Sequence, residues 1–230
     1  MTTPRRVWIT RTRPGADHTA ARVSALGWHA VVAPLLEVRP IADAMLHAPL
    51  PDQIAGLALT SPNTLDAIGD WGRFTHLPAY AVGDTTAKAA EAAGFANVLS
   101  AQGDIHALSA LIAAKAHMGT VFAPGAAEPA GDLPALLPDR TVIRLPVYET
   151  LPTNSQIPHD IDAVLLHSPR AARILSERLT PDQARALTAI TISAAAARPL
   201  NGLPFKEIRI SHTPDEEGVL TALGKSPTPV

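Results

Sequence analysis

Short apolar runs alternate with longer Ala-rich and Leu-rich stretches along the whole chain. Each run is too short for a helix and is flanked by polar, Gly or Pro residues, which is typical of strands buried on both faces. Alternating strands and helices predict parallel sheets covered by helices on both sides. The predicted strands are Arg5–Thr10, His29–Ala33, Gly56–Leu59, Ala79–Val82, Asn97–Leu99, Thr120–Ala123, Thr141–Leu145, Ala163–Leu166, Ala189–Ile192 and Glu207–Ile210.

The stretches between these runs have helical spacing. The segment 16–26 is a predicted helix that stops at Gly27, a residue that favours the position after a helix end. The segment 104–114 places its apolar residues on one face. Two proline-bearing segments, 34–41 and 146–152, are instead predicted to be extended.

Three motifs recur in the same order in the two halves of the chain. Glu149 lies 112 residues after Glu37 in the matching segments Ala-Pro-Leu-Leu-Glu and Leu-Pro-Val-Tyr-Glu. Ser168 lies 107 residues after Ser61, each before a proline, and Ala197 lies 110 residues after Ala87. Nearly constant offsets indicate duplication of an α/β unit, with chance similarity among Ala-rich helices as the alternative.

Composition narrows the class of protein. Of the 230 residues, 47% are hydrophobic and 17% are charged, which is enough to build a packed core. The formal net charge of -2 gives no indication of a nucleic-acid partner. The absence of cysteine excludes disulfides, thiolate catalysis and cysteine-based zinc sites. No run is long enough for a membrane span or a signal peptide, so we expect a soluble cytoplasmic protein.

Candidate ligand groups lie where predicted strands lead into helices. In parallel α/β sheets ligands bind beyond the carboxyl ends of the strands, and free N–H groups at helix starts attract anions. Taken singly, each turn is also explained as a helix cap. The turns offer Thr60, Ser61 and Asn63, then Gly83, Thr85 and Thr86, then Gly103, and Ser168 in the second half.

The sequence contains no motif for nucleotide binding, acyl transfer by a serine, or metal binding. The glycines form neither a dinucleotide fingerprint nor a P-loop, and no Gly-x-Ser-x-Gly elbow is present. The nine histidines lack metal-ligand spacing. His167 and His212 each precede a turn, where a capping or surface role is expected.

Several short segments stand in a fixed order along the chain: Ile9-Thr10-Arg11 with Gly27, Pro34-Leu35-Leu36, Leu59-Thr60-Ser61-Pro62-Asn63, Ala81-Val82-Gly83-Asp84-Thr85-Thr86-Ala87, Pro146-Val147-Tyr148-Glu149-Thr150 and His167-Ser168-Pro169. Together they resemble the uroporphyrinogen-III synthase family over roughly residues 5 to 223. The resemblance implies two flavodoxin-like, parallel-sheet α/β domains joined by a two-stranded β-ladder. Residues 1–36 and 152–230 would form a discontinuous first domain, with residues 37–151 inserted as the second.

The resemblance also implies an activity. Family members are cofactor-free lyases of heme biosynthesis that cyclise hydroxymethylbilane, inverting ring D through a spiro intermediate. Tyr148 would assist departure of the substrate hydroxyl as a proton donor. Arg11, Gly125 and the turn residues named above would bind the eight substrate carboxylates. We further expect a monomer that needs no metal or organic cofactor and has no nucleic-acid or membrane partner.

Two departures from the family pattern leave alternatives open. A Gly-x-Thr-Thr-Ala turn common in relatives is replaced by Ser193 and the alanines 194–197, and no arginine follows the turn at Gly125. We therefore expect the middle domain to dominate binding. The alternatives are a synthase-like paralogue with a non-catalytic binding role, and a two-lobed binding protein for a small anion.

Overall fold

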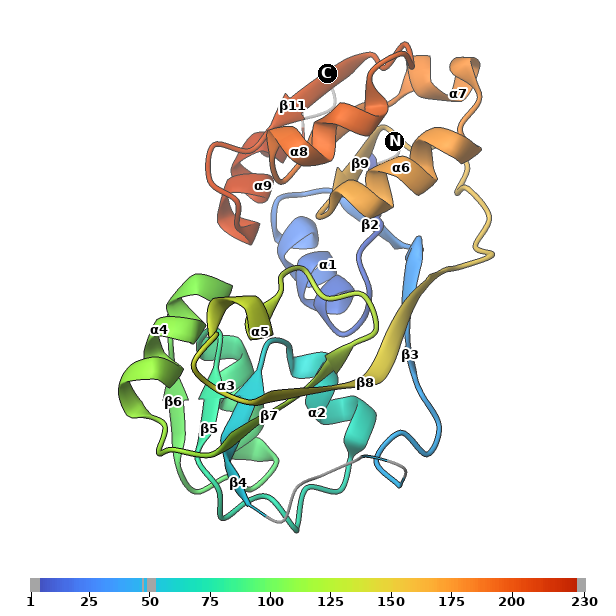
Figure 1. Cartoon of the computed structure of the whole chain (residues 1–230). Helices are drawn as coiled ribbons and strands as arrows, with labels where there is room; N and C mark the ends of the chain where they lie inside the picture. The colour runs from blue at the N-terminus through green and yellow to red at the C-terminus, as the bar shows by residue number, and fades with distance from the viewer. Residues whose placement is uncertain (1–4, 47, 49–52, 227–230) are drawn as a thin grey trace. The chain divides into compact units, whose positions relative to one another are not determined.

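The computed structural model describes residues 5–46, 48 and 53–226. Contacts divide the chain into two compact units: unit 1 comprises Met1–Glu37 and Leu151–Val230, and unit 2 comprises Val38–Thr150. The chain crosses between the units twice. One crossing lies in strand β3 (Leu36–Pro40) and the other in strand β8 (Val142–Pro152), as Figure 1 shows.

Unit 1 contains a five-stranded parallel sheet in the order β11-β10-β9-β1-β2. Numbered along the unit, these strands are arranged 2-1-3-4-5, the order of flavodoxin-like sheets. The central strands read as apolar runs because helices cover both of their faces. The strands are β1 (Arg6–Ile9), β2 (His29–Val32), β9 (Ala163–Leu166), β10 (Thr188–Thr191) and β11 (Glu207–Ile210).

Alternate residues of β1 point into two separate cores in unit 1. Val7 and Ile9 pack with residues of helices α1 (Gly15–Ala25) and α9 (Glu216–Leu223). Trp8 packs on the opposite face with residues of α6 (Pro169–Arg178). The remaining helical segments are α7 (Pro181–Ala186), α8 (Ala194–Ala197) and a 3-10 turn, Arg198–Leu200.

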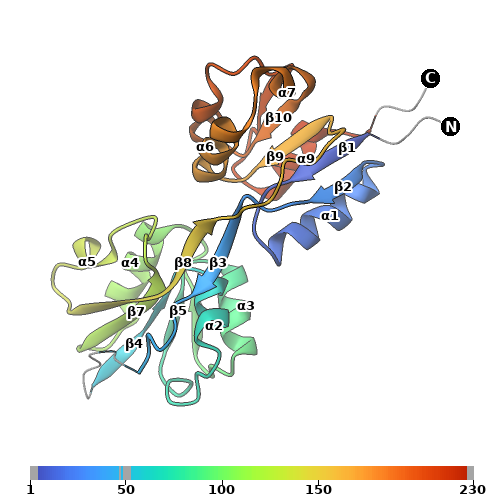
Figure 2. The same cartoon turned by 90° about the vertical axis from the view of Figure 1, so that its right-hand side faces the viewer.

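Unit 2 contains a six-stranded sheet in the order β3-β8-β7-β4-β5-β6. The strand pairings from β8 through to β6 are all parallel. Helices again lie on both faces, as the view in Figure 2 shows. The further elements are β4 (Ile54–Leu59), α2 (Pro62–Ile68), β5 (Ala79–Ala81), α3 (Asp84–Ala92), β6 (Val98–Ser100), α4 (Ile105–Lys115), β7 (Thr120–Ala126) and α5 (Leu133–Leu136).

The matched strands of the two sheets lie in the same spatial order, although they follow one another differently along the chain, and this agrees with the repeat seen in the sequence. The strand run β2-β1-β9-β10-β11 of unit 1 corresponds to β8-β7-β4-β5-β6 of unit 2. The matched serines Ser61 and Ser168 both cap helices that follow corresponding strands, β4 and β9. Gly83 and Ser193 likewise precede α3 and α8 with nearly identical extended backbones, φ -159° and φ -161°.

Sequence-based boundaries were wrong mainly in β7 and β8. The predicted strand 120–123 continues to Ala126, and the predicted strand 141–145 merges with the extended segment 146–152 into one strand. Pro146 is accepted there because the register between β7 and β8 becomes irregular just beyond its partner Gly125. The predicted alternation of strands and helices with parallel sheets is confirmed.

Candidate functional site

A cavity of about 520 Å³ lies at the carboxyl end of the sheet of unit 2. Strands β7 and β4 are neighbours, but the chain leaves β7 towards β8 and leaves β4 towards β5. Such a reversal of strand order opens a crevice, where open α/β sheets bind their ligands. The cavity lining includes Thr60 after β4, Val82 after β5, Asp104 before α4, and β7 residues.

Thr60 and Gly125 form adjoining parts of this lining. Thr60 is exposed and follows the last residue of β4, while Gly125 belongs to β7. A Cβ atom built on Gly125 would lie 3.7 Å from the Thr60 hydroxyl oxygen and, apart from the adjacent residues of the chain, would meet no other described residue within 4 Å. Glycine at this position therefore leaves room in the cavity beside a hydroxyl group.

Tyr148 of β8 also lines the cavity, although only 6% of its surface is exposed. The irregularity after Gly125 pairs Tyr148 with Ala126, and the Tyr148 carbonyl accepts the Ala127 N–H at 2.8 Å. A bulge of this kind re-aims a side chain. Within residues 5–46, 48 and 53–226 the phenol oxygen has no hydrogen-bond partner, so it is available to a ligand.

Arg144 contributes a positive charge to the cavity lining. It is exposed, and its guanidinium has no ion pair or hydrogen bond with the described part of the chain. Asp104, by contrast, is committed to capping α4, where it accepts the N–H groups of His106 and Ala107. The Ala107 N–H is the main cause that holds the Asp104 pKa below its usual value. A carboxylate ligand thus has one unengaged cation to bind.

The other predicted residues of unit 2 lie outside the cavity lining. Ser61 accepts the Asn63 N–H at 3.2 Å, and the Gly103 N–H donates to the Val82 carbonyl at 3.0 Å. Both groups are therefore used within the fold. Gly83 precedes α3, which has no side-chain cap, and Thr85 and Thr86 lie in its first turn, where the Thr86 side chain is buried at 3% exposure.

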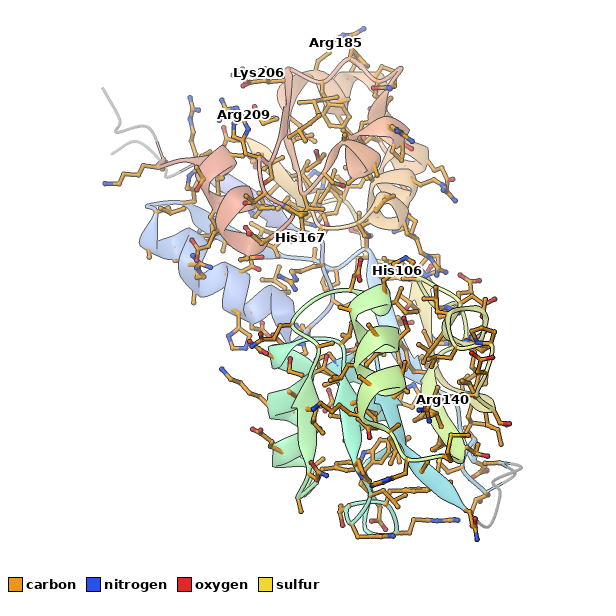
Figure 3. All side chains as sticks on the ribbon, turned by 60° about the vertical axis from the view of Figure 1, so that its left-hand side comes forward. His106, Arg140, His167, Arg185, Lys206 and Arg209 are labelled. Atoms are coloured by element: carbon orange, nitrogen blue, oxygen red, sulfur yellow. The ribbon has the colours of Figure 1, made fainter. Side chains whose placement is uncertain are left out.

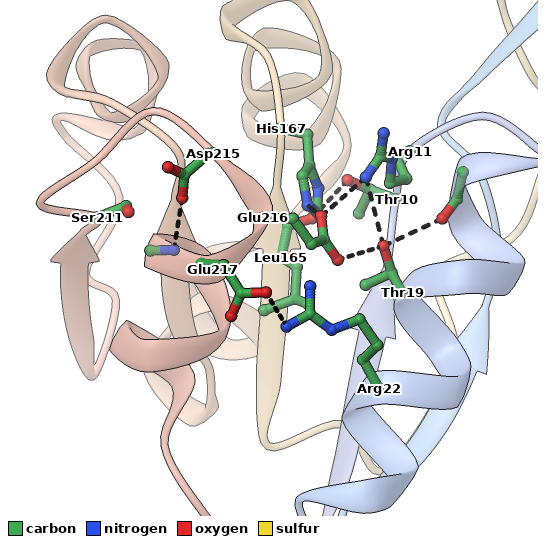
Figure 4. Close-up of polar contacts among 12 residues, drawn as sticks. Thr10, Arg11, Thr19, Arg22, Leu165, His167, Ser211, Asp215, Glu216 and Glu217 are labelled. Atoms are coloured by element: carbon green, nitrogen blue, oxygen red, sulfur yellow. Dashed lines mark hydrogen bonds and ion pairs between the residues drawn. The ribbon is translucent and has the colours of Figure 1, made fainter. Parts of the chain in front are cut away.

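The two predicted residues of unit 1 are engaged with their own chain. Ser168 caps α6 by accepting the Ala171 N–H at 3.1 Å. Arg11 donates to Glu216 at 2.8 Å, and the Nε2 atom of His167 lies 3.0 Å from the same carboxylate oxygen (Figure 4). Thr19 donates to the other oxygen of Glu216 at 2.6 Å. The expectation of a capping or surface role for His167 was wrong, because Ser168 caps α6 and only 9% of the His167 side chain is exposed.

Glu216 remains a carboxylate over most of the pH range. Its burial alone would raise the pKa, but hydrogen bonds from His167 and Thr19 and the charges of His167 and Arg11 hold the pKa at about 2. Sequence reasoning missed Glu216 and Arg144. The internal repeat could have pointed to Glu216. Asp104 and Asp215 cap helices that follow the corresponding strands β6 and β11, so Glu216 takes the position that Ile105 has in unit 2.

We expect Glu216 to make the protein acid-sensitive. A carboxyl whose pKa falls from its ordinary value of 4.5 to about 2 on folding stabilises the protein above pH 4.5, and this stability is lost as the pH falls towards 2. The free energy of unfolding should drop by roughly 3 kcal/mol through this group between pH 5 and pH 2. Urea unfolding across this range, compared with Glu216→Gln, measures the contribution.

Glu217→Gln is the matched control, because Glu217 is adjacent to Glu216 in the chain and its own side chain is 75% exposed. It should keep the wild-type pH dependence, whereas Glu216→Gln should flatten it. Equal slopes for wild type and Glu216→Gln would contradict the assignment.

Three basic residues labelled in Figure 3 have structural partners. Arg140 donates to the carbonyls of Ala113, Ala116 and His117 at the end of α4. Arg209 pairs with Glu207, and Arg185 with Asp182. Within the described residues, no group of three or more His, Cys, Asp or Glu could hold a metal ion. No helix in that part of the chain is long and apolar enough to cross a membrane.

Comparisons with known proteins agree on one family. The family model described as Uroporphyrinogen-III synthase HemD matches residues 17–221. The fold is similar to that of uroporphyrinogen-III synthetase from Helicobacter pylori, with 18% identity, a TM-score of 0.63, and 96% of this chain and 98% of that chain covered. It is also similar to a mutant uroporphyrinogen III synthase from Thermus thermophilus, with 16% identity, a TM-score of 0.54, and 95% and 97% covered. A comparison with curated protein sequences gives no match.

Proposed function

Because the chain belongs to the uroporphyrinogen-III synthase family, we propose that it closes hydroxymethylbilane with the substrate held at the cavity of unit 2. The protein is a lyase of tetrapyrrole biosynthesis. In the reaction the hydroxyl of the ring A hydroxymethyl group takes up a proton and leaves as water, the methylene carbon stays on ring A, and ring D is inverted through a spiro intermediate before the ring closes.

The main observation in support of the proposed site is that the cavity lies at the point of the sheet where ligands are expected. The cavity lies where the strand order of unit 2 reverses, and three residues expected from sequence, Thr60, Gly125 and Tyr148, line it together. Position in the sheet and side-chain chemistry therefore support the same location.

In the proposed complex, substrate carboxylates bind the Arg144 guanidinium and the Thr60 hydroxyl. Further carboxylates are bound by the uncapped first turn of α3, where backbone N–H groups and the exposed Thr85 are available. The Tyr148 phenol donates a proton to the departing hydroxyl. The remaining task of the site is to hold the two ends of the substrate in the geometry that leads to inversion.

We also propose that β3 and β8 act as a two-stranded link between two domains. They are neighbours in the sheet order, and both crossings between units occur within them. The domain boundaries expected from the sequence each lie one residue from the point where the contacts divide the chain, which supports this proposal.

A coupled assay tests the function directly. Hydroxymethylbilane is supplied, and the ratio of type III to type I uroporphyrinogen is measured after oxidation to the porphyrins. Closure without the enzyme gives the uninverted type I isomer, so we expect the type III isomer to dominate when the protein is present. A product mixture equal to that of the buffer control would overturn the proposal.

Replacing Arg144 by alanine should raise KM about tenfold while kcat changes less than threefold. A charge-assisted hydrogen bond to a carboxylate contributes roughly 1.5–3 kcal/mol, and exposure of Arg144 favours the lower end. Steady-state kinetics measure both constants.

Arg173→Ala is the control, because Arg173 is an exposed arginine of α6 in unit 1 and its removal changes the net charge equally. Its KM should stay near the wild-type value. An unchanged KM in Arg144→Ala would place the carboxylate contact elsewhere.

A further inference from the structure

The point of unit 1 that corresponds to the cavity of unit 2 contains a cluster of charged side chains. Strands β1 and β9 are neighbours, and the chain leaves β1 towards β2 and β9 towards β10. Arg11 lies just beyond β1, and His167 directly follows β9. Both residues therefore lie at the reversal of strand order in unit 1, as Gly125 and Thr60 do in unit 2.

Glu216 occupies this point with its carboxylate. It is the first residue of α9 after the Asp215 cap, whereas the corresponding first residue of α4 is Ile105, which lines the cavity of unit 2. Three donors converge on the Glu216 carboxylate: Arg11 at 2.8 Å, His167 Nε2 at 3.0 Å and Thr19 at 2.6 Å (Figure 4). This is the set of contacts that a bound carboxylate ligand would receive.

Two features distinguish these donors from an ordinary structural ion pair. The Nδ1 atom of His167 is buried and has no partner within the described residues, although buried polar atoms are nearly always hydrogen-bonded. The Arg11 guanidinium packs against the backbone of Gly15, where an added Cβ would lie 2.7 Å from Nε. Glycine at position 15 thus makes the space in which Arg11 lies.

Displacement of Glu216 is sterically feasible. Its side chain is 23% exposed and that of Arg11 is 36% exposed, so an incoming carboxylate can reach the guanidinium from solvent. Rotation of a side chain in the first turn of a helix requires no change in the sheet. The adjacent Glu217 is bound separately by Arg22.

We propose that Arg11 and His167 form a carboxylate-binding site of unit 1, which Glu216 occupies until a carboxylate of the ligand displaces it. The ligand class is a polycarboxylate, and identification of that ligand as the tetrapyrrole substrate rests on the proposed function. Glu216 then acts as an internal competitor that lowers the affinity of the site for the ligand.

The binding test uses propane-1,2,3-tricarboxylate as the probe and the imidazole NMR signals of His167 as the readout. Glu216→Gln should bind the probe five- to tenfold more tightly than wild type and shift the His167 signals at saturation. Adding Arg11→Ala to Glu216→Gln should remove the gain. The uncharged triamide of the probe should give no shift in any variant.

Two further variants separate binding from stability. Glu217→Gln should bind the probe as wild type does, because its carboxylate does not reach Arg11 or His167. Gly15→Ala should weaken binding about tenfold by displacing Arg11, with α1 retained. If Glu216→Gln is poorly folded by thermal melting, Gly15→Ala and Arg11→Ala still decide the question in the wild-type background.

A separate experiment measures turnover of hydroxymethylbilane. A lower KM for hydroxymethylbilane in Glu216→Gln, with kcat unchanged, supports the tetrapyrrole as the ligand. If no type III product forms in wild type, the proposed function fails, yet the probe still tests the site. Equal probe affinity in wild type and Glu216→Gln, with His167 signals unmoved, would overturn the inference whatever the turnover.

Discussion

Replacing Gly125 by leucine should lower kcat/KM at least roughly 300-fold while the protein stays folded. Among the described residues beyond its chain neighbours, a Cβ at this position meets the Thr60 hydroxyl alone, at an ordinary contact distance of 3.7 Å, so the first carbon is accommodated. The remaining three carbons of leucine must then enter the cavity of about 520 Å³ that Thr60, Gly125 and Tyr148 line. Displacing the substrate by about 1 Å is enough to cost roughly 100-fold in rate.

Gly125→Ala is the matched control for this prediction. Its single methyl group fits the space beside Thr60, so kcat/KM should stay within about threefold of wild type. Circular dichroism and thermal melting should show both variants folded. Full activity in Gly125→Leu would mean that the substrate does not use this cavity.

Replacing Tyr148 by phenylalanine should lower kcat about 100-fold and leave KM within about twofold. A positioned proton donor contributes roughly 100-fold or more to a step in which a hydroxyl leaves as water. The phenol has no hydrogen-bond partner among the described residues, so its removal leaves no buried group unsatisfied. The free energy of unfolding should therefore change by less than about 0.5 kcal/mol.

Tyr80 provides the control, because it is the other tyrosine of the chain and is also buried in unit 2. It does not line the cavity, and burial raises the pKa of its phenol. Tyr80→Phe should keep the wild-type kcat. The type III to type I ratio should be measured in both variants, since slower turnover with an unchanged ratio would separate proton transfer from control of ring inversion. A wild-type kcat in Tyr148→Phe would remove the phenol from the mechanism.

The two units differ at the point where the strand order reverses. Unit 2 leaves its strand reversal open, with Thr60, Tyr148 and Arg144 around it. Unit 1 places its own carboxylate there, bound by Arg11 and His167. The expectation that the middle domain dominates binding stays a prediction, and this difference between the units supports it.

The sequence by itself determined the secondary structure because short-range patterns encode it. The run 163–166 reads as a strand because it is apolar throughout, and the structure buries it on both faces. Ser61 and Ser168 read as helix caps because each precedes a proline at the first helical position, and both accept backbone N–H groups as expected. The repeat offsets likewise predicted a duplicated α/β unit, and in the structure corresponding turns follow corresponding strands.

Only the tertiary structure decided which polar groups remain available to a ligand. Ser61 and Gly103 have suitable chemistry in the sequence, but each is used by a partner within the fold. Arg11 is bound by Glu216, which a ligand must displace in the site we propose. Arg11 and Glu216 are 205 residues apart, and no local pattern links them. Hydrogen bonds and ion pairs depend on contacts within a few ångströms, whereas propensity and periodicity report only on neighbours within a turn or two of chain. The sequence therefore predicted which polar side chains lie at the strand ends. Which of them are already hydrogen-bonded within the protein could be seen only in the tertiary structure.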